Sequence, residues 1–169
     1  EAITQFGGIV EEKEGGYLAR KTKSLKGAHI HLPYPSVGAT ETCLFLGATA
    51  EGRTVITNAA IEPEIMELIT MLRFMGAIIF TSPAREIRID GVKNLYGTRI
   101  KILGDRIDAA SWACLACASK GEITVEDIRP EMLGNFLSFY SQVGGGFELV
   151  KDDCIKFFRK LDKLRPAVI

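Results

Sequence analysis

The chain has 169 residues, and its 21 Lys and Arg balance its 21 Asp and Glu, so the formal net charge is zero. This balance argues against nucleic acid or an anionic membrane surface as a partner. Hydrophobic residues make up 47% and charged residues 25%, a composition that excludes a disordered chain. No apolar stretch approaches the roughly 20 residues that a membrane span needs.

The N-terminus and the cysteines bear on the cellular compartment of the protein. The chain begins with Glu1 rather than Met, and its first residues lack the pattern of a secretory signal. Four cysteines at irregular spacing do not resemble a disulfide framework. We therefore expect a cytoplasmic protein with reduced thiols, of which this chain is a piece.

A weak internal repeat with a nearly constant offset organises the sequence. A partial third copy, Gln5–Val10 followed by Tyr17–Ala19, matches the end of the other two. The matched pairs are Glu51–Ile56 with Lys120–Val125, Ile61–Ile65 with Ile128–Met132, and Phe74–Ile79 with Gln142–Gly146.

The first complete copy predicts alternating strands and helices. Ser36 is a good N-cap, Pro63 suits the start of a helix, and Gly76 suits its end. Apolar residues at helical spacing follow Pro63. In chain order we predict a strand at 28–32, a helix at about 39–50, a strand at 54–56, a helix from 63, and strands at 77–80 and 86–89.

The second copy repeats the order β-α-β-α-β-β. We predict strands near 99–103, 123–125, 147–150 and 155–158, and helices near 107–119 and 130–143. The fold class is therefore α/β (α+β), with helices on one side of each sheet, two repeat units and a partial third. Gly and Asn residues at 90–97 favour a junction between the units.

The strongest local signal for a binding site is Pro35-Ser-Val-Gly-Ala-Thr40, between a predicted strand and a predicted helix. Such a turn directs free backbone N–H groups, a hydroxyl and the positive helix end at one point, which suits a phosphate group. The alternative is a simple N-cap followed by a Gly that serves packing. Spacing alone favours the N-cap, because such joints are common.

For three further sets of residues, the sequence pattern favours a structural role over a chemical one. The basic residues Arg20, Lys21, Lys23 and Lys26 are typical of a solvated face. Cys114 and Cys117 lie in a helix of small residues that we expect to be buried, and no further ligands accompany them. His29 and His31 share one face of a strand, again without further ligands. We expect no metal and no cofactor.

Four charged residues lie at predicted helix starts. Glu62 and Glu64 flank Pro63, where acidic groups favour the helix dipole. Asp105 and Arg106 open a helix of the second copy, as a cap with a local ion pair. None of them forms a complete catalytic site.

Taken together, five strings resemble a known series in order and spacing over nearly all of the chain. They are Leu25–Ile30, Pro35–Glu41, Ala50–Ala60, Glu62–Ile65 and Asp105–Ala109. They closely resemble the UDP-N-acetylglucosamine 1-carboxyvinyltransferase family, whose members start peptidoglycan synthesis. The combination of Ser-Val-Gly-Ala-Thr with Asn-Ala-Ala-x-Glu-Pro-Glu is more specific than either string alone.

The resemblance implies an inside-out α/β barrel of two domains, each built from three β-α-β-α-β-β units. Residues 1–97 then end one domain, with a partial unit at 1–24 and a full unit at 25–97. Residues 98–169 then form the first unit of the second domain. Substrates bind in the cleft between the domains, which makes Glu62, Glu64, Asp105 and Arg106 candidate cleft or hinge residues.

The resemblance also implies a reaction. The family transfers the enolpyruvyl group of phosphoenolpyruvate to the 3-hydroxyl of the UDP-sugar and releases phosphate. The matching positions for the UDP-sugar are Tyr34, Pro35, Ser36, Val37 and Gly38, although position 34 is often basic in the family. The family's catalytic residues match no segment of this chain, so we expect no catalytic residue here and an inactive chain without the remainder of the enzyme.

Two alternatives stay open. One is the related 3-phosphoshikimate 1-carboxyvinyltransferase, which typically has Ser-Ser-Gln where this sequence has Ser-Val-Gly-Ala-Thr. The other is a non-catalytic repeat module of the same fold. Separate titrations with UDP-N-acetylglucosamine and shikimate 3-phosphate distinguish the three.

Overall fold

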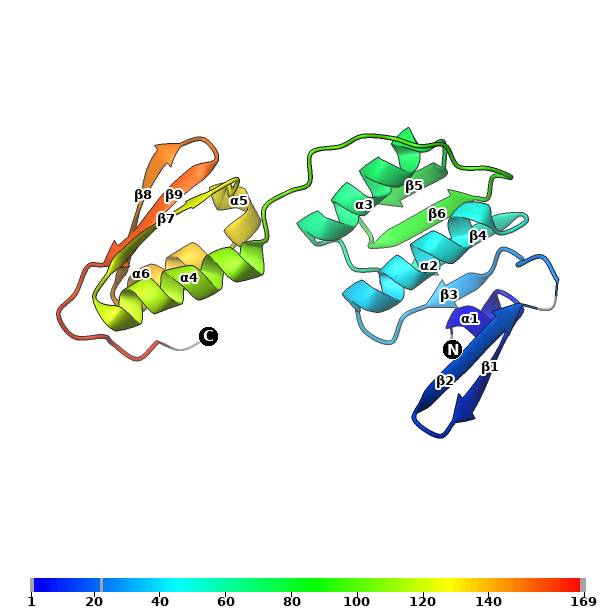
Figure 1. Ribbon diagram of the computed structural model, residues 1–169, viewed down its shortest axis with the longest axis horizontal. Helices are drawn as coiled ribbons and strands as arrows, with labels where there is room; N and C mark the ends of the chain where they lie inside the picture. Colours follow the sequence, from blue (N-terminus) through cyan, green and yellow to red (C-terminus); the bar gives the residue numbers. More distant parts are fainter. Residues whose placement is uncertain (1, 22, 168–169) are drawn as a thin grey trace. The chain divides into compact units, whose positions relative to one another are not determined.

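The computed structural model describes residues 2–21 and 23–167, which form two compact units, Glu1–Lys101 and Ile102–Ile169 (Figure 1). The N-terminal unit begins with the short helix α1 (Ala2–Gln5) and an antiparallel hairpin of β1 (Gly8–Lys13) and β2 (Gly16–Lys21). This hairpin confirms the prediction that the partial copy ends as the complete copies do.

A four-stranded sheet and two helices make up the rest of the N-terminal unit. The sheet order is β3-β4-β6-β5, with β3 parallel to β4 and the other pairs antiparallel. The predicted order β-α-β-α-β-β is confirmed. The elements are β3 (His29–His31), α2 (Val37–Thr49), β4 (Arg53–Thr57), α3 (Pro63–Phe74), β5 (Ile78–Ser82) and β6 (Glu86–Asp90).

Both helices cover the same face of this sheet (Figure 1). From α3, Ile65, Ile69 and Leu72 are buried, which confirms most of its predicted apolar face. They pack with buried residues of α2 and with the inward side chains of the pleated strands. The core residues of the four strands are Ile30, Ile56, Ile79, Ile87 and Ile89.

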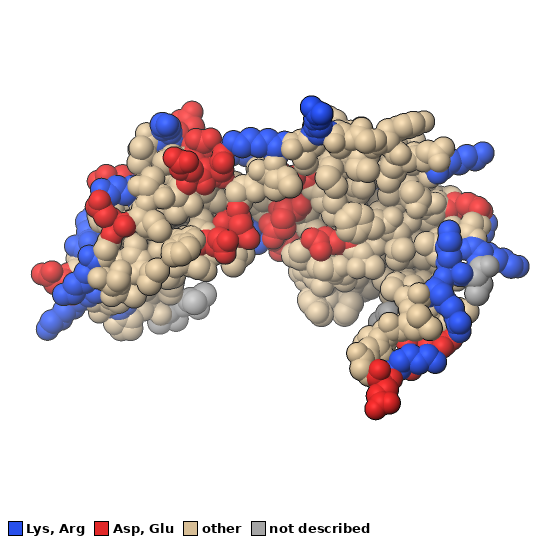
Figure 2. Space-filling model, viewed as in Figure 1, with Lys and Arg blue, Asp and Glu red and all other residues tan. Residues whose placement is uncertain are grey.

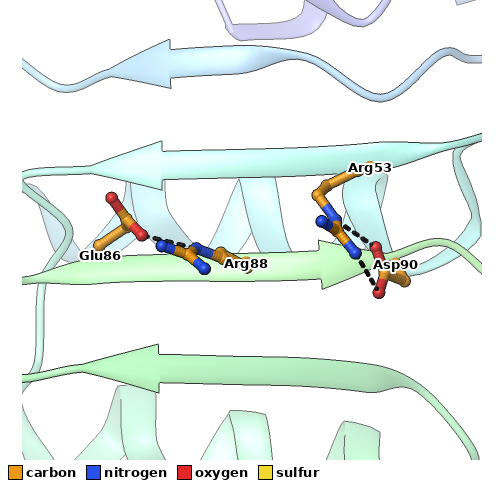
Figure 3. Close-up of polar contacts among 4 residues, drawn as sticks. All are labelled: Arg53, Glu86, Arg88 and Asp90. Carbon is orange, nitrogen blue, oxygen red and sulfur yellow. Dashed lines mark hydrogen bonds and ion pairs between the residues drawn. The ribbon is translucent and has the colours of Figure 1, made fainter.

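The opposite face of the sheet is open and charged (Figure 3). Arg53 on β4 donates to both carboxylate oxygens of Asp90 on β6, at 2.7 and 3.1 Å. This bond lowers the pKa of the Asp90 carboxyl. Arg88 donates to Glu86 two positions earlier on β6, at 2.7 Å. Exposed pairs of this kind contribute little stability, so the buried face holds the unit together.

One buried polar atom weakens that core. Thr54 is fully buried, and its Oγ1 has no hydrogen-bond partner within the described residues. Because an unpaired buried hydroxyl costs free energy, we expect Thr54→Val to raise the free energy of unfolding by about 1 kcal/mol. Thermal denaturation measures this. Thr57→Val is the control, because the Thr57 hydroxyl bonds to His31 at 2.9 Å; an equal gain in both variants would contradict the assignment.

The C-terminal unit has a three-stranded antiparallel sheet of order β7-β9-β8, covered by helices. Its elements are α4 (Arg106–Ser119), β7 (Glu122–Glu126), α5 (Pro130–Leu133), α6 (Phe136–Val143), β8 (Gly145–Lys151) and β9 (Cys154–Arg159). Tyr140, Ile155 and Phe157 are at the centre of its core.

Two predictions for this unit are wrong. No strand forms at 99–103, because this described segment has no ladder partner beside β7, and Ile102 is 72% exposed. The second unit therefore lacks the first strand of its repeat. The predicted helix 130–143 is two helices, because Gly134 has φ 48° and ψ −127°, a conformation outside the helical region.

The backbone conformation repeats together with the sequence. Residues with positive φ recur at the same nearly constant offset, including positions without Gly. Asn58 after β4 and Asp127 after β7 have φ of 56° and 57°. Gly7, Gly76 and Gly144 follow α1, α3 and α6, each with positive φ, and each precedes a hairpin. The sequence repeat therefore corresponds to a structural repeat.

Within the described residues, no helix has both the length and the apolar character that crossing a bilayer requires.

Candidate functional site

The turn between β3 and α2 is built around Ser36. Its Oγ accepts a hydrogen bond from the Ala39 N–H at 3.3 Å, and its carbonyl accepts from the Thr40 N–H at 3.0 Å. Ser36 is therefore the N-cap of α2, as predicted. The Ser36 hydroxyl still has its own proton to donate, because it acts as an acceptor in this cap.

Two motifs that are distant in sequence are joined at this turn. The buried Thr40 Oγ1 donates to the Ser36 carbonyl at 2.8 Å and accepts from the Ala60 N–H at 3.0 Å. Asn58, in the left-handed conformation, donates from Nδ2 to the Leu32 carbonyl at 2.9 Å. The strings Ser-Val-Gly-Ala-Thr and Asn-Ala-Ala thus hold the end of β3 and the start of α2 together.

This arrangement leaves the first amides of α2 available. The N–H groups of the first helical residues, Val37 and Gly38, have no partner within a helix. Gly38 has open space around it, since a Cβ placed on it would contact nothing within 4 Å. Tyr34 and Pro35 are exposed, Tyr34 at 66%. An anion at this point would meet two backbone donors, one hydroxyl and the positive end of a 13-residue helix.

A pocket of about 330 Å³ opens beside the turn. Of the five predicted residues, Tyr34 and Ser36 line it, whereas Pro35, Val37 and Gly38 do not. One wall comes from the short helix α1, which sequence analysis missed because so short a helix shows no helical period. The other lining residues are Ala2, Ile3, Gln5, Ile30, His31, Leu32, Pro33, Ala39 and Thr42. The lining is mostly apolar with a few polar groups, as is typical of small-molecule sites.

The acidic candidates at the start of α3 are half-buried. Glu62 occupies the N-cap position without a capping bond, and its Oε2 accepts from the Ile61 N–H at 2.8 Å. Glu64 lies in the first turn of α3, where a negative charge favours the helix dipole.

In the C-terminal unit, Asp105 is the N-cap of α4, as predicted. Its Oδ1 accepts from the N–H groups of Ile107 at 2.7 Å and Asp108 at 3.2 Å. Arg106 is the first residue of α4. The structure brings Glu62 and Glu64 together in one unit, and Asp105 and Arg106 together in the other.

Two of the four residues of the predicted basic face form ion pairs with acidic neighbours. Arg20 forms an ion pair with Glu11 across the hairpin, and Lys26 forms one with Glu51. Figure 2 shows basic and acidic side chains close together over the hairpin. This pairing supports the interpretation of a solvated surface.

All four cysteines are free thiols. Cys43, Cys117 and Cys154 are buried, and burial raises the pKa of the Cys43 thiol to about 11. Cys114 is exposed, so the prediction of a fully buried pair is wrong: Cys114 and Cys117 are three positions apart but only Cys117 packs inward. Partial desolvation and the neighbouring Cys117 also raise the pKa of Cys114, which makes it a weak nucleophile.

The histidines form no metal centre in the described part of the chain. His31 bonds through Nδ1 to the Thr57 hydroxyl at 2.9 Å, and both histidines are exposed on β3. No group of three or more His, Cys, Asp or Glu suited to a metal ion is found among residues 2–21 and 23–167.

The fold is that of an enolpyruvyl transferase. The enolpyruvyl transferase NikO from Streptomyces tendae superposes with a TM-score of 0.80 at 19% identity, covering 98% of this chain and 42% of that one. An EPSP synthase from Acinetobacter baumannii superposes with a TM-score of 0.63 at 21% identity, covering 95% and 39%.

The sequence defines the family. The profile of EPSP synthase (3-phosphoshikimate 1-carboxyvinyltransferase) matches residues 1–153, so the chain belongs to this family. Among curated relatives, UDP-N-acetylglucosamine 1-carboxyvinyltransferase from Protochlamydia amoebophila is 46% identical over 162 residues, 94% of this chain and 35% of the relative. A Streptococcus mutans protein described as UDP-N-acetylglucosamine 1-carboxyvinyltransferase 2 is 40% identical over the whole of this chain and 40% of its own length. The chain thus spans little more than a third of these relatives.

Proposed function

We propose that the chain is part of an enzyme that transfers the enolpyruvyl group of phosphoenolpyruvate to the 3-hydroxyl of UDP-N-acetylglucosamine and releases phosphate. This is the first committed step of peptidoglycan synthesis. The observation that carries the proposal is the 40–46% identity to relatives that are named for this activity. Four free thiols support a reducing, cytoplasmic setting.

The substrate site that we propose is the strand–turn–helix joint of Tyr34, Pro35, Ser36, Val37 and Gly38. The diphosphate of the UDP-sugar would accept hydrogen bonds from the Val37 and Gly38 amides and from the Ser36 hydroxyl. Tyr34 supplies a neutral hydroxyl and an aromatic ring where the family often has a cation. The ring borders the 330 Å³ pocket, which supports contact with an uncharged part of the substrate.

We assign the two compact units to two domains of an inside-out α/β barrel. The family resemblance makes Glu62 and Glu64, at the start of α3, and Asp105 and Arg106, at the start of α4, the candidate cleft or hinge residues of this assignment. The remaining chemistry, including general acid–base groups and the cations that hold phosphoenolpyruvate, belongs to segments outside this chain.

The exposed hairpin β1–β2 supports the proposal that this chain packs against the remainder of the enzyme chain. The counterparts of β2 in the complete copies, β6 and β9, each lie between two strands, whereas β2 has one neighbour within the described residues. All residues of β2 are exposed, and an isolated two-stranded hairpin is marginally stable in water. A further strand of the enzyme would complete this sheet.

The experiment that tests the function is a pair of calorimetric titrations on the full chain. We expect UDP-N-acetylglucosamine to bind and shikimate 3-phosphate not to bind. In a separate assay, we expect phosphoenolpyruvate with UDP-N-acetylglucosamine to release no phosphate above a blank without protein. Preference for shikimate 3-phosphate would favour 3-phosphoshikimate 1-carboxyvinyltransferase, the relative named by the family profile. Binding of neither ligand would favour a non-catalytic repeat module.

The variant Ser36→Ala, in the same titration, tests whether Ser36 binds the substrate. We expect UDP-N-acetylglucosamine affinity to fall by about 1–2 kcal/mol, because a hydrogen bond to a charged group is lost. Loss of the N-cap should also lower the free energy of unfolding by about 1 kcal/mol. Thr70→Ala is a control, because its hydroxyl donates to the Met66 carbonyl within α3 at 2.8 Å and Thr70 does not line the pocket. A lowered melting temperature with an unchanged Kd would leave Ser36 with the capping role alone.

A further inference from the structure

Among the described residues that line the pocket beside the β3–α2 turn, one side chain can carry a positive charge. The lining has no Lys, Arg, Asp or Glu, and His31 and Tyr34 are its two titratable residues. Because a phenol stays neutral until about pH 9, the charge of this lining depends on His31. The donors of the turn itself, the Ser36 hydroxyl and the Val37 and Gly38 amides, are neutral.

The hydrogen bonds between β3 and β4 determine which nitrogen of this imidazole carries the proton. The Thr57 hydroxyl donates to the Ile30 carbonyl at 3.4 Å, so it accepts from Nδ1 of His31, which lies 2.9 Å away. The neutral ring therefore has its proton on Nδ1 and a lone pair on Nε2. A second proton added at Nε2 leaves the bond to Thr57 in place. His31 can thus become a cation without any rearrangement of the sheet.

The elements that pack against β3 bring few charges to His31. Among them are α1, which has the sequence Ala-Ile-Thr-Gln, and β4, whose charged residue is Arg53. Arg53 lies at the opposite end of β4 from Thr57 and is paired with Asp90. The helix α2 contributes uncharged side chains to the lining. His29 shares the exposed face of β3 with His31 but does not line the pocket. No acidic group of the described lining therefore competes with an anionic ligand for the protonated ring.

We propose that His31, protonated at Nε2, binds the diphosphate of the UDP-sugar from the wall of this pocket. This role rests on the function and the substrate site proposed above. The cationic ring donates from Nε2 to a phosphate oxygen, whereas the neutral ring presents a lone pair there and repels that oxygen. His31 thus supplies the positive charge that the Ser36 hydroxyl and the neutral amides of the turn lack.

This role makes the affinity for the UDP-sugar depend on pH. A diphosphate diester keeps its full negative charge between about pH 5 and 8, whereas histidine changes its charge in that range. Because the ligand binds the protonated form of His31, protons and the UDP-sugar favour each other's binding, and the affinity falls as the pH rises. We expect an affinity about fivefold higher at pH 5.5 than at pH 8.0, which is the upper range for an exposed charge pair.

Calorimetric titration of the full chain with UDP-N-acetylglucosamine at pH 5.5 and pH 8.0 tests the role of His31. We expect the ratio of the two Kd values to be about five in the unmodified chain and about one in His31→Gln, whose side chain forms hydrogen bonds but cannot be protonated. Titrations in two buffers of different ionisation enthalpy measure proton uptake directly. At neutral pH the unmodified chain should take up protons on binding, and His31→Gln should take up none.

His29→Gln is the matched control, because His29 is exposed on the same face of the same strand and does not line the pocket. This variant should keep both the pH dependence and the proton uptake. Equal Kd values at the two pH values in the unmodified chain, or a pH dependence that survives His31→Gln, would overturn the role of His31 and leave the proposed function standing. Absence of binding at both pH values would overturn the proposed function, and this role with it.

Discussion

Tyr140→Ala is expected to unfold the C-terminal unit. Tyr140 is 1% exposed, stacks on Phe136 with ring centroids 5.5 Å apart, and meets Phe157 edge-on at 5.7 Å. Removing a buried aromatic side chain costs about 3–5 kcal/mol, a large part of the stability of so small a unit. Loss of amide protection on β7, β8 and β9, with the N-terminal unit still protected, would measure this. Retained protection on β9 would contradict it.

Tyr140→Phe separates the hydroxyl from the ring. The hydroxyl lies 2.9 Å from the Ala113 carbonyl and 3.2 Å from the Phe158 carbonyl, so it links α4 to β9. We expect this variant to lose about 1–2 kcal/mol, less than the alanine variant, because the packing of the rings remains.

The same hydroxyl makes the unit sensitive to alkaline pH. Burial, and to a lesser degree the nearby cysteines, raise the pKa of Tyr140 above its ordinary value of 10.0. A raised folded-state pKa means that this contribution to stability is complete below pH 10 and is lost as the pH rises beyond it. Tyr140→Phe should remove that part of the alkaline destabilisation.

The elements that sequence predicted correctly depend on local signals. Ser36 begins α2 through a bond to an amide three positions away, and Gly76 ends α3 because it adopts φ 99°. Hairpins follow from alternation and turn residues in one stretch of chain. The repeat adds to this, because each copy supports the order of elements in the other.

The errors depend on contacts between distant residues. Residues 99–103 have the composition of a strand, but a strand needs a neighbouring ladder, and β7 is not paired with them. Apolar periodicity runs through Gly134 although its backbone leaves the helical region. Cys114 and Cys117 have the spacing of one helix face, yet only the packing of α4 decides which of them is covered.

The candidate site likewise combines residues that local sequence predicts with residues that come from a distant segment. Tyr34 and Ser36 were predicted because the strand–turn–helix joint is local. The opposite wall of the pocket, from Ala2, Ile3 and Gln5, is distant in sequence, and nothing in the periodicity of such a short helix indicates it. The bond from Ala60 to Thr40 explains why the two motifs occur together: they hold one turn.

Gly91→Ala is expected to destabilise the N-terminal unit strongly. A Cβ at Gly91 would lie 1.7 Å from the carbonyl oxygen of Ala50, at the end of α2. The clash is with backbone, so no side chain can move aside to relieve it. The Gly91 N–H also donates to the Gly52 carbonyl at 3.0 Å, and the Val92 N–H donates to the Ala48 carbonyl. A shift of the chain would therefore break the bonds that tie the end of β6 to the end of α2.

We expect Gly91→Ala to lower the free energy of unfolding by about 3 kcal/mol, the upper range for overpacking. For a unit of this size that corresponds to a fall in Tm on the order of 10 °C or more. Gly97→Ala is the matched control, because a Cβ at Gly97 meets nothing within 4 Å and should change stability by less than about 0.5 kcal/mol. Equal melting temperatures for the two variants would contradict the close approach of Gly91 to α2, and with it the packing that holds the start of the connecting segment on the N-terminal unit.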